Sequence, residues 1–265
     1  MTIKNVLSKG VAVASLAGVS AFGMTACEQV GAACQTAHGD FAVKLFLKSG
    51  TGECSQEAGG VFGVNSYNYP TSDGKRPDLS RGSVAIQAEA LGVLVDDAEI
   101  RLGELPDPAN KPYAKGDWSG GEPVGGVCTL PTMSDAVQNL PALEAVPDDP
   151  ETPDDDESLP AEPAKAFKYA WSNVQFTVSP AATGTAFLGT LEYTKDGCTA
   201  TYEAWGLYPA VFCGDAEGNP IDKFCEAEAD PENGFPLGSG INPDFKVHCD
   251  PDLLLCMLTD RPRGD

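Results

Sequence analysis

Histidine is scarce in this sequence of 265 residues, which contains only His38 and His248. The chain has no Cys-x-x-Cys pair, which argues against structural zinc. It also has no Gly-x-Ser-x-Gly motif, which argues against the nucleophile turn of an α/β-hydrolase. Basic residues are few, with 17 Lys and Arg against 39 Asp and Glu. This balance argues against nucleic acid as a partner, because such binding depends on neutralising phosphates with basic side chains.

The N-terminal residues 1–26 have the build of a secretory signal peptide, with two lysines before an uncharged apolar run. The run is too short for a transmembrane helix, which needs about 20 apolar residues. The segment leads into Met24-Thr25-Ala26-Cys27, which resembles the lipobox of bacterial lipoproteins, with Met24 where leucine is usual. The resemblance implies cleavage before Cys27 and lipidation of its thiol. The alternative is ordinary cleavage near Ala21.

The cysteine count supports lipidation. The chain has nine cysteines, so eight remain if Cys27 carries lipid, and an even number suits a disulfide framework in an exported protein. The disulfide candidates are Cys34, Cys54, Cys128, Cys198, Cys213, Cys225, Cys249 and Cys256. Ordinary cleavage would leave an odd thiol in an oxidising compartment.

The acidity of the chain limits how it can meet a membrane. The net charge falls from −22 to −24 when the two lysines of the signal peptide are removed, so the surface repels anionic head groups. The lipid on Cys27 would then hold the protein to the membrane, and several acyl chains together anchor stably. Glu28 stands where Asp would retain a lipoprotein in the inner membrane. We therefore predict a lipid-anchored protein of the bacterial outer membrane.

The composition changes most clearly at residues 146–164, which hold five prolines, eight acids and no base. Such a segment buries too little apolar surface to offset its ordering entropy, so an extended loop is predicted. Specific metal binding by the carboxylates is the alternative, although runs of charge are usually only solvated. Three disulfide candidates precede the segment and five follow it, so at least one bridge must cross it if all eight pair. Few contacts cross a domain boundary, so we predict one domain over 27–265.

The individual pairings are less determined, because eight cysteines allow about 105 arrangements. Cys34 and Cys54 lie close in sequence and form the predicted local pair. Cys128 then crosses the acidic segment, with Cys198 as its predicted mate. The remaining four cysteines are predicted to pair among themselves in the C-terminal tail.

Alternation of apolar and polar residues predicts strands before the acidic segment, at 41–50 and 61–70. Residues 83–102 fit a strand followed by one short helix. Glycine and proline make 103–130 a predicted loop. A further short helix is predicted over 135–139, capped by the serine before it.

The residues after the acidic segment predict an antiparallel meander. Residues 167–180 form a strand with an expected bulge at Ser172-Asn173, and Asp196-Gly197 predicts a type I′ turn between two further strands. Residues 245–259 supply one or two more short strands. The predicted fold is mostly β, an antiparallel β-sandwich or open barrel with one or two short helices and long disulfide-stapled loops.

No residue pattern predicts a catalytic, cofactor or metal site. Residues 215–226 follow the letters of an EF-hand calcium loop, but Pro220 stands where the loop needs glycine, so a polar turn is the expected structure. A catalytic triad would need a histidine, and the context of His38 suggests a turn, that of His248 a strand. Arg263-Gly264-Asp265 spells an adhesion tripeptide, which we interpret as a coincidence.

Aromatic residues gather in the predicted meander. They could form an exposed platform for carbohydrate, or the core of the sheet, which is the preferred interpretation. These residues are Tyr169, Trp171, Tyr193, Tyr202, Trp205 and Tyr208.

The stretches "DGCTATYEAWGLYPAVFC" and "GSGINPDFKVHCDPDLLLC" resemble the acidic, cysteine-rich lipoproteins of myxobacteria. The resemblance implies an envelope location and a β-rich fold but no particular activity. We predict a non-catalytic binding or structural module, anchored by its N-terminal lipid, with a protein or glycan of the cell envelope as its partner. The alternative is an exported hydrolase with an unrecognised active site.

Overall fold

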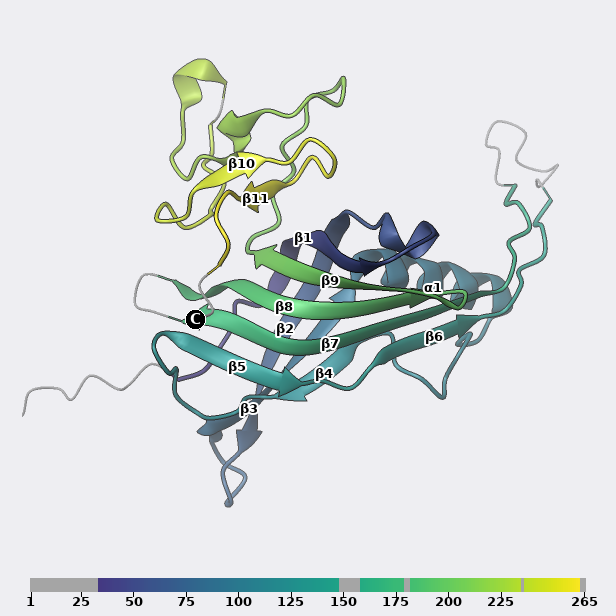
Figure 1. The fold of residues 1–265 in the computed structure, drawn as a ribbon, viewed down its shortest axis with the longest axis horizontal. Coiled ribbons are helices and arrows are strands. Elements are labelled where there is room, and N and C mark those ends of the chain that lie inside the picture. Colours follow the sequence, from purple (N-terminus) through teal and green to yellow (C-terminus); the bar gives the residue numbers. More distant parts are fainter. Residues whose placement is uncertain (1–32, 148–157, 179–181, 235, 263–265) are drawn as a thin grey trace, which may run out of the picture. The chain divides into compact units, whose positions relative to one another are not determined.

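One large antiparallel sheet dominates the computed structural model (Figure 1). The structure describes residues 33–147, 158–178, 182–234 and 236–262, which all lie in one compact unit, Ala32–Asp265. Nine strands pair in the order β4-β3-β2-β1-β9-β8-β7-β5, and β6 also pairs with β7. Their bounds are Gly39–Gly50 (β1), Gly59–Pro70 (β2), Pro77–Ala88 (β3), Ala114–Asp117 (β4), Val127–Thr132 (β5), Ala136–Leu140 (β6), Lys165–Val178 (β7), Thr183–Lys195 (β8) and Cys198–Leu207 (β9).

This architecture confirms the mostly antiparallel β fold that the sequence predicts. The nine strands form one large sheet that does not close into a barrel, and no second large sheet packs on it as in a sandwich among the described residues. The hairpin between β8 and β9 turns at Asp196-Gly197, where both residues have positive φ, 50° and 84°, as a type I′ turn requires. The expected bulge in β7 is also present. The register against β8 shifts between Ser172 and Gln175, and Asn173 has a φ of 50°.

The α-helix α1, Glu89–Leu102, follows β3 directly, as the sequence predicts. Its buried side chains, Leu91, Val95 and Ala98, recur at helical spacing and face the sheet. The helix ends at Gly103, whose left-handed conformation, φ 73°, caps the last turn. α1 lies across one face of the sheet (Figure 1) and thereby creates a space between helix and strands.

Two predictions about local structure are wrong. Residues 135–139 fall mostly within β6 rather than in a helix, because Ala136, Gln138 and Leu140 alternate inward at strand period and pair with β7. The predicted loop 103–130 contains β4 and the start of β5. These strands are only 4 and 6 residues long, so their alternation is too brief to stand out among glycines and prolines.

Aromatic side chains make up much of the hydrophobic core that packs against the large sheet. Phe41 is fully buried and lies 6.2 Å from Phe176 and 5.7 Å from Phe187 between ring centroids. Trp171 extends this cluster, 6.0 Å from Phe187 and edge-on to Phe62 at 5.7 Å. Contacts of this kind contribute about 0.5–1.5 kcal/mol each beyond the area that they bury. The aromatic residues of the meander therefore serve mainly as core.

The C-terminal segment after β9 is held by disulfides and a small sheet. Its strands are β10, Val247–Cys249, and β11, Cys256–Leu258. Three short 3-10 helices complete the described elements: η1 at Glu53–Ser55, η2 at Asp222–Cys225 and η3 at Pro231–Asn233. Lys44 Nζ of β1 lies 3.0 Å from Asp250 Oδ2, so an ion pair joins the segment to the large sheet.

The eight predicted cysteines form four disulfides, Cys34–Cys128, Cys54–Cys198, Cys213–Cys249 and Cys225–Cys256. One bridge crosses the acidic segment, as the count requires, and the last four cysteines pair among themselves.

The predicted pairs Cys34–Cys54 and Cys128–Cys198 are wrong. β1 carries the chain along the sheet between Cys34 and Cys54, which places them at opposite ends of a 12-residue strand. Each therefore bonds to a cysteine that strand pairing brings to its own end.

The ends of the acidic segment are paired rather than free. Val146 pairs with Leu159, and Leu143 with Glu162, by isolated antiparallel bridges. Residues 148–157 lie outside the described part of the chain. The segment therefore leaves and re-enters the fold as two paired stems, in agreement with an internal loop.

Candidate functional site

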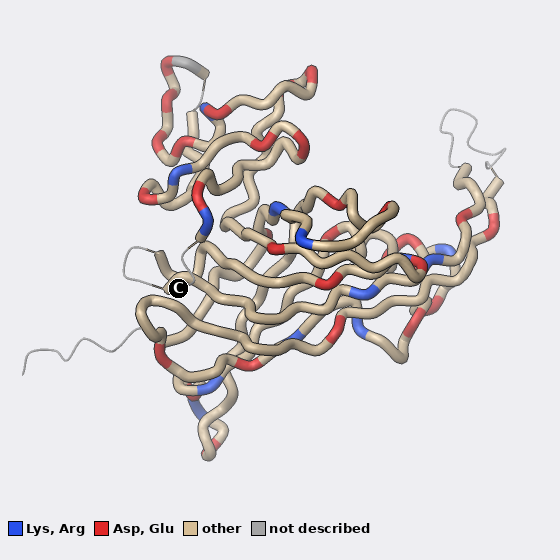
Figure 2. The backbone as a smooth tube through the Cα atoms, viewed as in Figure 1, with Lys and Arg blue, Asp and Glu red and all other residues tan. Residues whose placement is uncertain are grey.

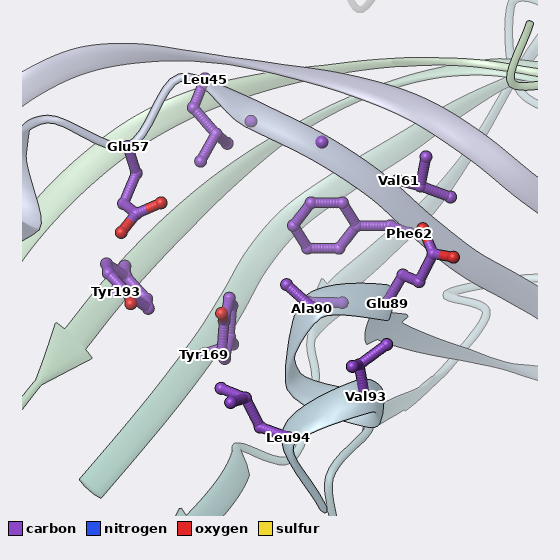
Figure 3. A pocket seen from close by; sticks show the side chains of 13 residues that line it. Leu45, Glu57, Val61, Phe62, Glu89, Ala90, Val93, Leu94, Tyr169 and Tyr193 are labelled. Atoms are coloured by element: carbon purple, nitrogen blue, oxygen red, sulfur yellow. The ribbon is translucent and has the colours of Figure 1, made fainter. Parts of the chain in front are cut away.

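A pocket of about 490 Å³ lies between α1 and the sheet, and its residues come from α1, β1, β2, the ends of β3, β7 and β8, and the loop before β2 (Figure 3). This volume is within the range of about 300–1,000 Å³ that is typical of small-molecule sites. The pocket is mostly apolar. Its apolar lining consists of Leu45, Val61, Phe62, Ala88, Ala90, Val93 and Leu94.

The pocket extends from buried residues at its floor to exposed residues at its mouth. Phe62 and Leu45 are 4% and 8% exposed and form its floor, whereas Val93 of α1 is 60% exposed and stands at its mouth. Gly59 and Gly60 also line it, and a Cβ on Gly60 would meet no atom within 4 Å. A Cβ on Gly59 would lie 1.9 Å from the Val43 carbonyl oxygen, so only glycine fits there.

Three polar side chains converge at one end of this apolar space. The Glu57 carboxylate and the phenols of Tyr193 and Tyr169 lie at the same end of the pocket (Figure 3). The two tyrosine rings lie 4.9 Å apart. Burial, followed by the charge of Glu57, raises the pKa of Tyr169 to about 12, and burial also raises the pKa of Tyr193. Both phenols therefore remain protonated at neutral pH and act as hydrogen-bonding groups.

The loop that carries Glu57 is held in place by β9. The disulfide Cys54–Cys198 ties the loop to the start of that strand. The hydroxyl of Tyr202, also in β9, donates to the Cys54 carbonyl oxygen and accepts from the Glu57 N–H at 3.2 Å. A disulfide and two hydrogen bonds thus fix the backbone of the loop that carries Glu57.

The histidines do not meet in a shared site. His38 Nε2 lies 2.9 Å from Ser66 Oγ, a separation that suits a nucleophile and its base. His38 is exposed, however, and neither residue lines the pocket beside α1. His248 lies in β10 opposite Met257, as expected for a strand residue.

The calcium-like stretch folds as the polar turn that the sequence predicts. The carboxylate of Asp215 accepts bonds from the N–H groups of Glu217 and Asn219 and from the Asn219 side-chain amide. Nearby, the sulfurs of Cys213, Cys225 and Cys256 lie within 4.8 Å of one another, but all three belong to disulfides.

The predicted lipidation residue, Cys27, lies outside the described residues, and so does the tripeptide Arg263-Gly264-Asp265, which we interpret as a coincidence. Among the aromatic residues of the meander, Trp171, Tyr193 and Tyr202 are buried, as the core interpretation expects. The sequence analysis did not identify Glu57 as a site residue. It is one acid among 39, and only its disulfide-linked loop, which depends on the pairing of Cys54, sets it apart.

Taken together, these features define a disulfide-stapled antiparallel β protein with a preformed apolar pocket. The chain belongs to the MlpA family, whose sequence model matches residues 39–209. The match runs from the start of β1 to just beyond β9, so it contains the large sheet and the pocket.

A relative from Myxococcus xanthus, named "Putative lipoprotein MlpA", is 34% identical over 88 residues. This alignment covers 33% of the present chain and 33% of the relative, so the chain matches about a third of the relative's length. No solved structure matches the chain. Among the described residues, no helix has the length and apolar character needed to cross a membrane.

Proposed function

We propose that this protein is a lipid-anchored, non-catalytic binding protein of the cell envelope that holds a small apolar molecule in the pocket beside α1. The carrying observation is the convergence of Glu57, Tyr169 and Tyr193 on one end of an otherwise apolar cavity of about 490 Å³. A site of this kind takes up an apolar body and orients it through a few polar contacts. The ligand itself could be free or belong to a larger envelope component.

The proposed anchor is a lipid on Cys27, with residues 1–26 as the cleaved signal peptide. The lipobox-like Met24-Thr25-Ala26-Cys27 and the pairing of the other eight cysteines support it. The name of the Myxococcus xanthus relative as a lipoprotein also supports it. Glu28, in place of the aspartate of the inner-membrane signal, favours the outer membrane.

The polar groups of the pocket suit binding better than catalysis. The raised pKa values of Tyr169 and Tyr193 keep both hydroxyls protonated, so neither is an activated nucleophile or base at neutral pH. The pair formed by His38 and Ser66 is the arrangement closest to the hydrolase alternative, but it sits on an exposed surface where water is not excluded.

The test is a fluorescence titration with Nile red, a neutral apolar dye, on the native protein and two variants. Ala90→Trp places a large ring at the pocket wall, and Ala90 is exposed, so the fold should tolerate it. Ile100→Trp is the matched control, because Ile100 is on the same helix, 82% exposed and outside the pocket lining.

We expect saturable binding with one site in the native protein and in Ile100→Trp, and a loss of at least about tenfold in affinity, or about 1.4 kcal/mol, in Ala90→Trp. Equal binding by all three proteins, or no saturable binding by any, would contradict the proposed function.

A further inference from the structure

The charged side chains that line the pocket beside α1 are all acidic. Glu57 and Glu89 are its only ionisable acids, and its described lining contains no lysine, arginine or histidine. Glu57 lies at the end with the two tyrosines, and Glu89 lies beside Phe62 at the first turn of α1 (Figure 3). An apolar ligand that spans the pocket therefore meets a carboxylate and no cation.

In the described part of the chain, the Glu57 carboxylate has no cationic partner. No lysine or arginine of the described residues forms an ion pair with Glu57 or Glu89, although the same sheet pairs Lys44 with Asp250 at 3.0 Å. Glu57 is half-buried and lies at the same end of the pocket as the Tyr193 phenol (Figure 3). A charged group that is withdrawn from water is stabilised when an opposite charge approaches it.

The net negative charge of the whole chain also favours cationic ligands over anionic ones. The net charge is −22, and acidic segments are spread along the described fold, with few basic ones (Figure 2). A field of one sign raises the local concentration of oppositely charged ligands and lowers that of like-charged ligands. An anionic amphiphile such as a fatty acid would have to bring its carboxylate toward both this field and Glu57.

We infer that the pocket selects apolar ligands that carry a protonated amine, an inference that rests on the proposed function of the same site. The apolar body lies against Phe62, Val61 and Leu94, and the ammonium group donates to the Glu57 carboxylate. An ammonium has three donors and no acceptor, so a second N–H can reach a phenolic oxygen at the same end. The neutral analogue keeps the apolar contacts and loses the charge-assisted bond.

The test uses three ligands with the same alkyl chain, decylamine, decanol and decanoate, each below its micelle concentration. Their dissociation constants are measured at neutral pH by displacement of Nile red from the native protein. We expect decylamine to bind about tenfold more tightly than decanol, which corresponds to about 1.4 kcal/mol, and decanoate to bind most weakly.

Two variants test whether the preference for decylamine over decanol comes from the pocket. Glu57→Gln keeps the size of the side chain and removes its charge, so in this variant decylamine should bind no more tightly than decanol. Glu53→Gln is the matched control, because Glu53 lies in the same loop but outside the pocket lining, and it should keep the tenfold preference. Thermal unfolding of both variants verifies that they fold.

The outcomes separate this inference from the proposed function. Tight binding of decanol with equal or tighter binding of decanoate would overturn the inference and leave the apolar site intact. A preference for decylamine that persists in Glu57→Gln would also overturn it, because general surface charge would then explain the effect. Failure of all three ligands to displace the dye would contradict the proposed function itself.

Discussion

The backbone N–H of Glu57 donates a hydrogen bond of 3.2 Å to the hydroxyl of Tyr202, a residue 145 positions later in the chain. The same hydroxyl donates to the carbonyl oxygen of Cys54, whose sulfur is bonded to Cys198. Tyr202 is 1% exposed, so this network lies inside the protein. It connects the core of the sheet to the polar end of the pocket, and it makes the position of Glu57 depend on β9.

The first prediction concerns this network. Tyr202→Phe leaves the Cys54 carbonyl oxygen and the Glu57 N–H without their partner, so we expect a loss of about 1–3 kcal/mol in the free energy of unfolding. Urea denaturation measures it. Tyr69→Phe is the control, because the Tyr69 hydroxyl bonds to Asp117 at an exposed position and should cost much less. An equal effect of both variants would contradict the role of Tyr202.

The second prediction concerns the bridge across the acidic loop. A Glu-specific protease should cut first at Glu151 or Glu157 in this proline-rich segment. Because Cys54–Cys198 joins the two sides, the fragments should run together on a denaturing gel without reductant and separate with it.

The double variant Cys54→Ser/Cys198→Ser supplies the control for that experiment. Its fragments should separate without reductant, and its unfolding free energy should fall by about 2–5 kcal/mol. Fragments of the native protein that separate without reductant would show that no disulfide crosses the loop.

The third prediction concerns acid stability. Burial by itself raises the pKa of Asp250, but bonds from Lys44 Nζ and from the N–H groups of Leu253 and Asp252 outweigh it and lower the pKa below the ordinary 3.8. A lowered pKa favours the ionised form in the folded protein. Its contribution to stability is therefore complete above the unfolded pKa and is lost as the pH falls through the folded value.

We therefore expect Asp250→Asn to be less stable than the native protein at neutral pH, with a smaller further loss below about pH 4. Thermal unfolding over a pH series measures both effects. Asp252→Asn is the matched control, because the Asp252 side chain is 72% exposed and bonds to the same Lys44 Nζ. A native-like acid profile in Asp250→Asn would contradict the assignment.

The fourth prediction concerns the anchor. In a bacterial host that processes lipoproteins, Cys27→Ser should release the protein from the membrane fraction and abolish labelling by palmitate. Cys34→Ser is the control, because Cys34 is in a disulfide with Cys128 and should keep the label. Unchanged labelling of Cys27→Ser would show that the lipid is attached elsewhere.

The sequence allows much of the fold to be predicted, because most of its elements are specified locally. Alternation at residues 41–50 identifies β1, and Asp196-Gly197 identifies the central hairpin. The split of the eight disulfide candidates, three before the acidic loop and five after it, predicts that a bridge crosses the loop. The particular mates depend on which strand ends lie together, a property of the whole sheet that cysteine spacing does not contain.

The pocket is harder to predict for the same reason. Tyr169 and Tyr193 face each other because β7 pairs with β8 in one register, and Glu57 reaches them through a disulfide between distant residues. The helix α1 is predictable from its apolar spacing, but its position over the sheet is not. A site built from five separate parts of the chain leaves no motif in any one of them.

The central claim is that the space between α1 and the sheet is a ligand site, and photoaffinity labelling tests it most directly. An alkylamine that carries a diazirine in its chain is bound to the full protein, irradiated and located by peptide mass spectrometry. We predict labelled peptides that contain residues 57–62 or 88–94, with labelling suppressed by excess decylamine and in Ala90→Trp but not in Ile100→Trp. Labelling confined to other peptides, or unaffected by decylamine and by Ala90→Trp, would contradict the claim.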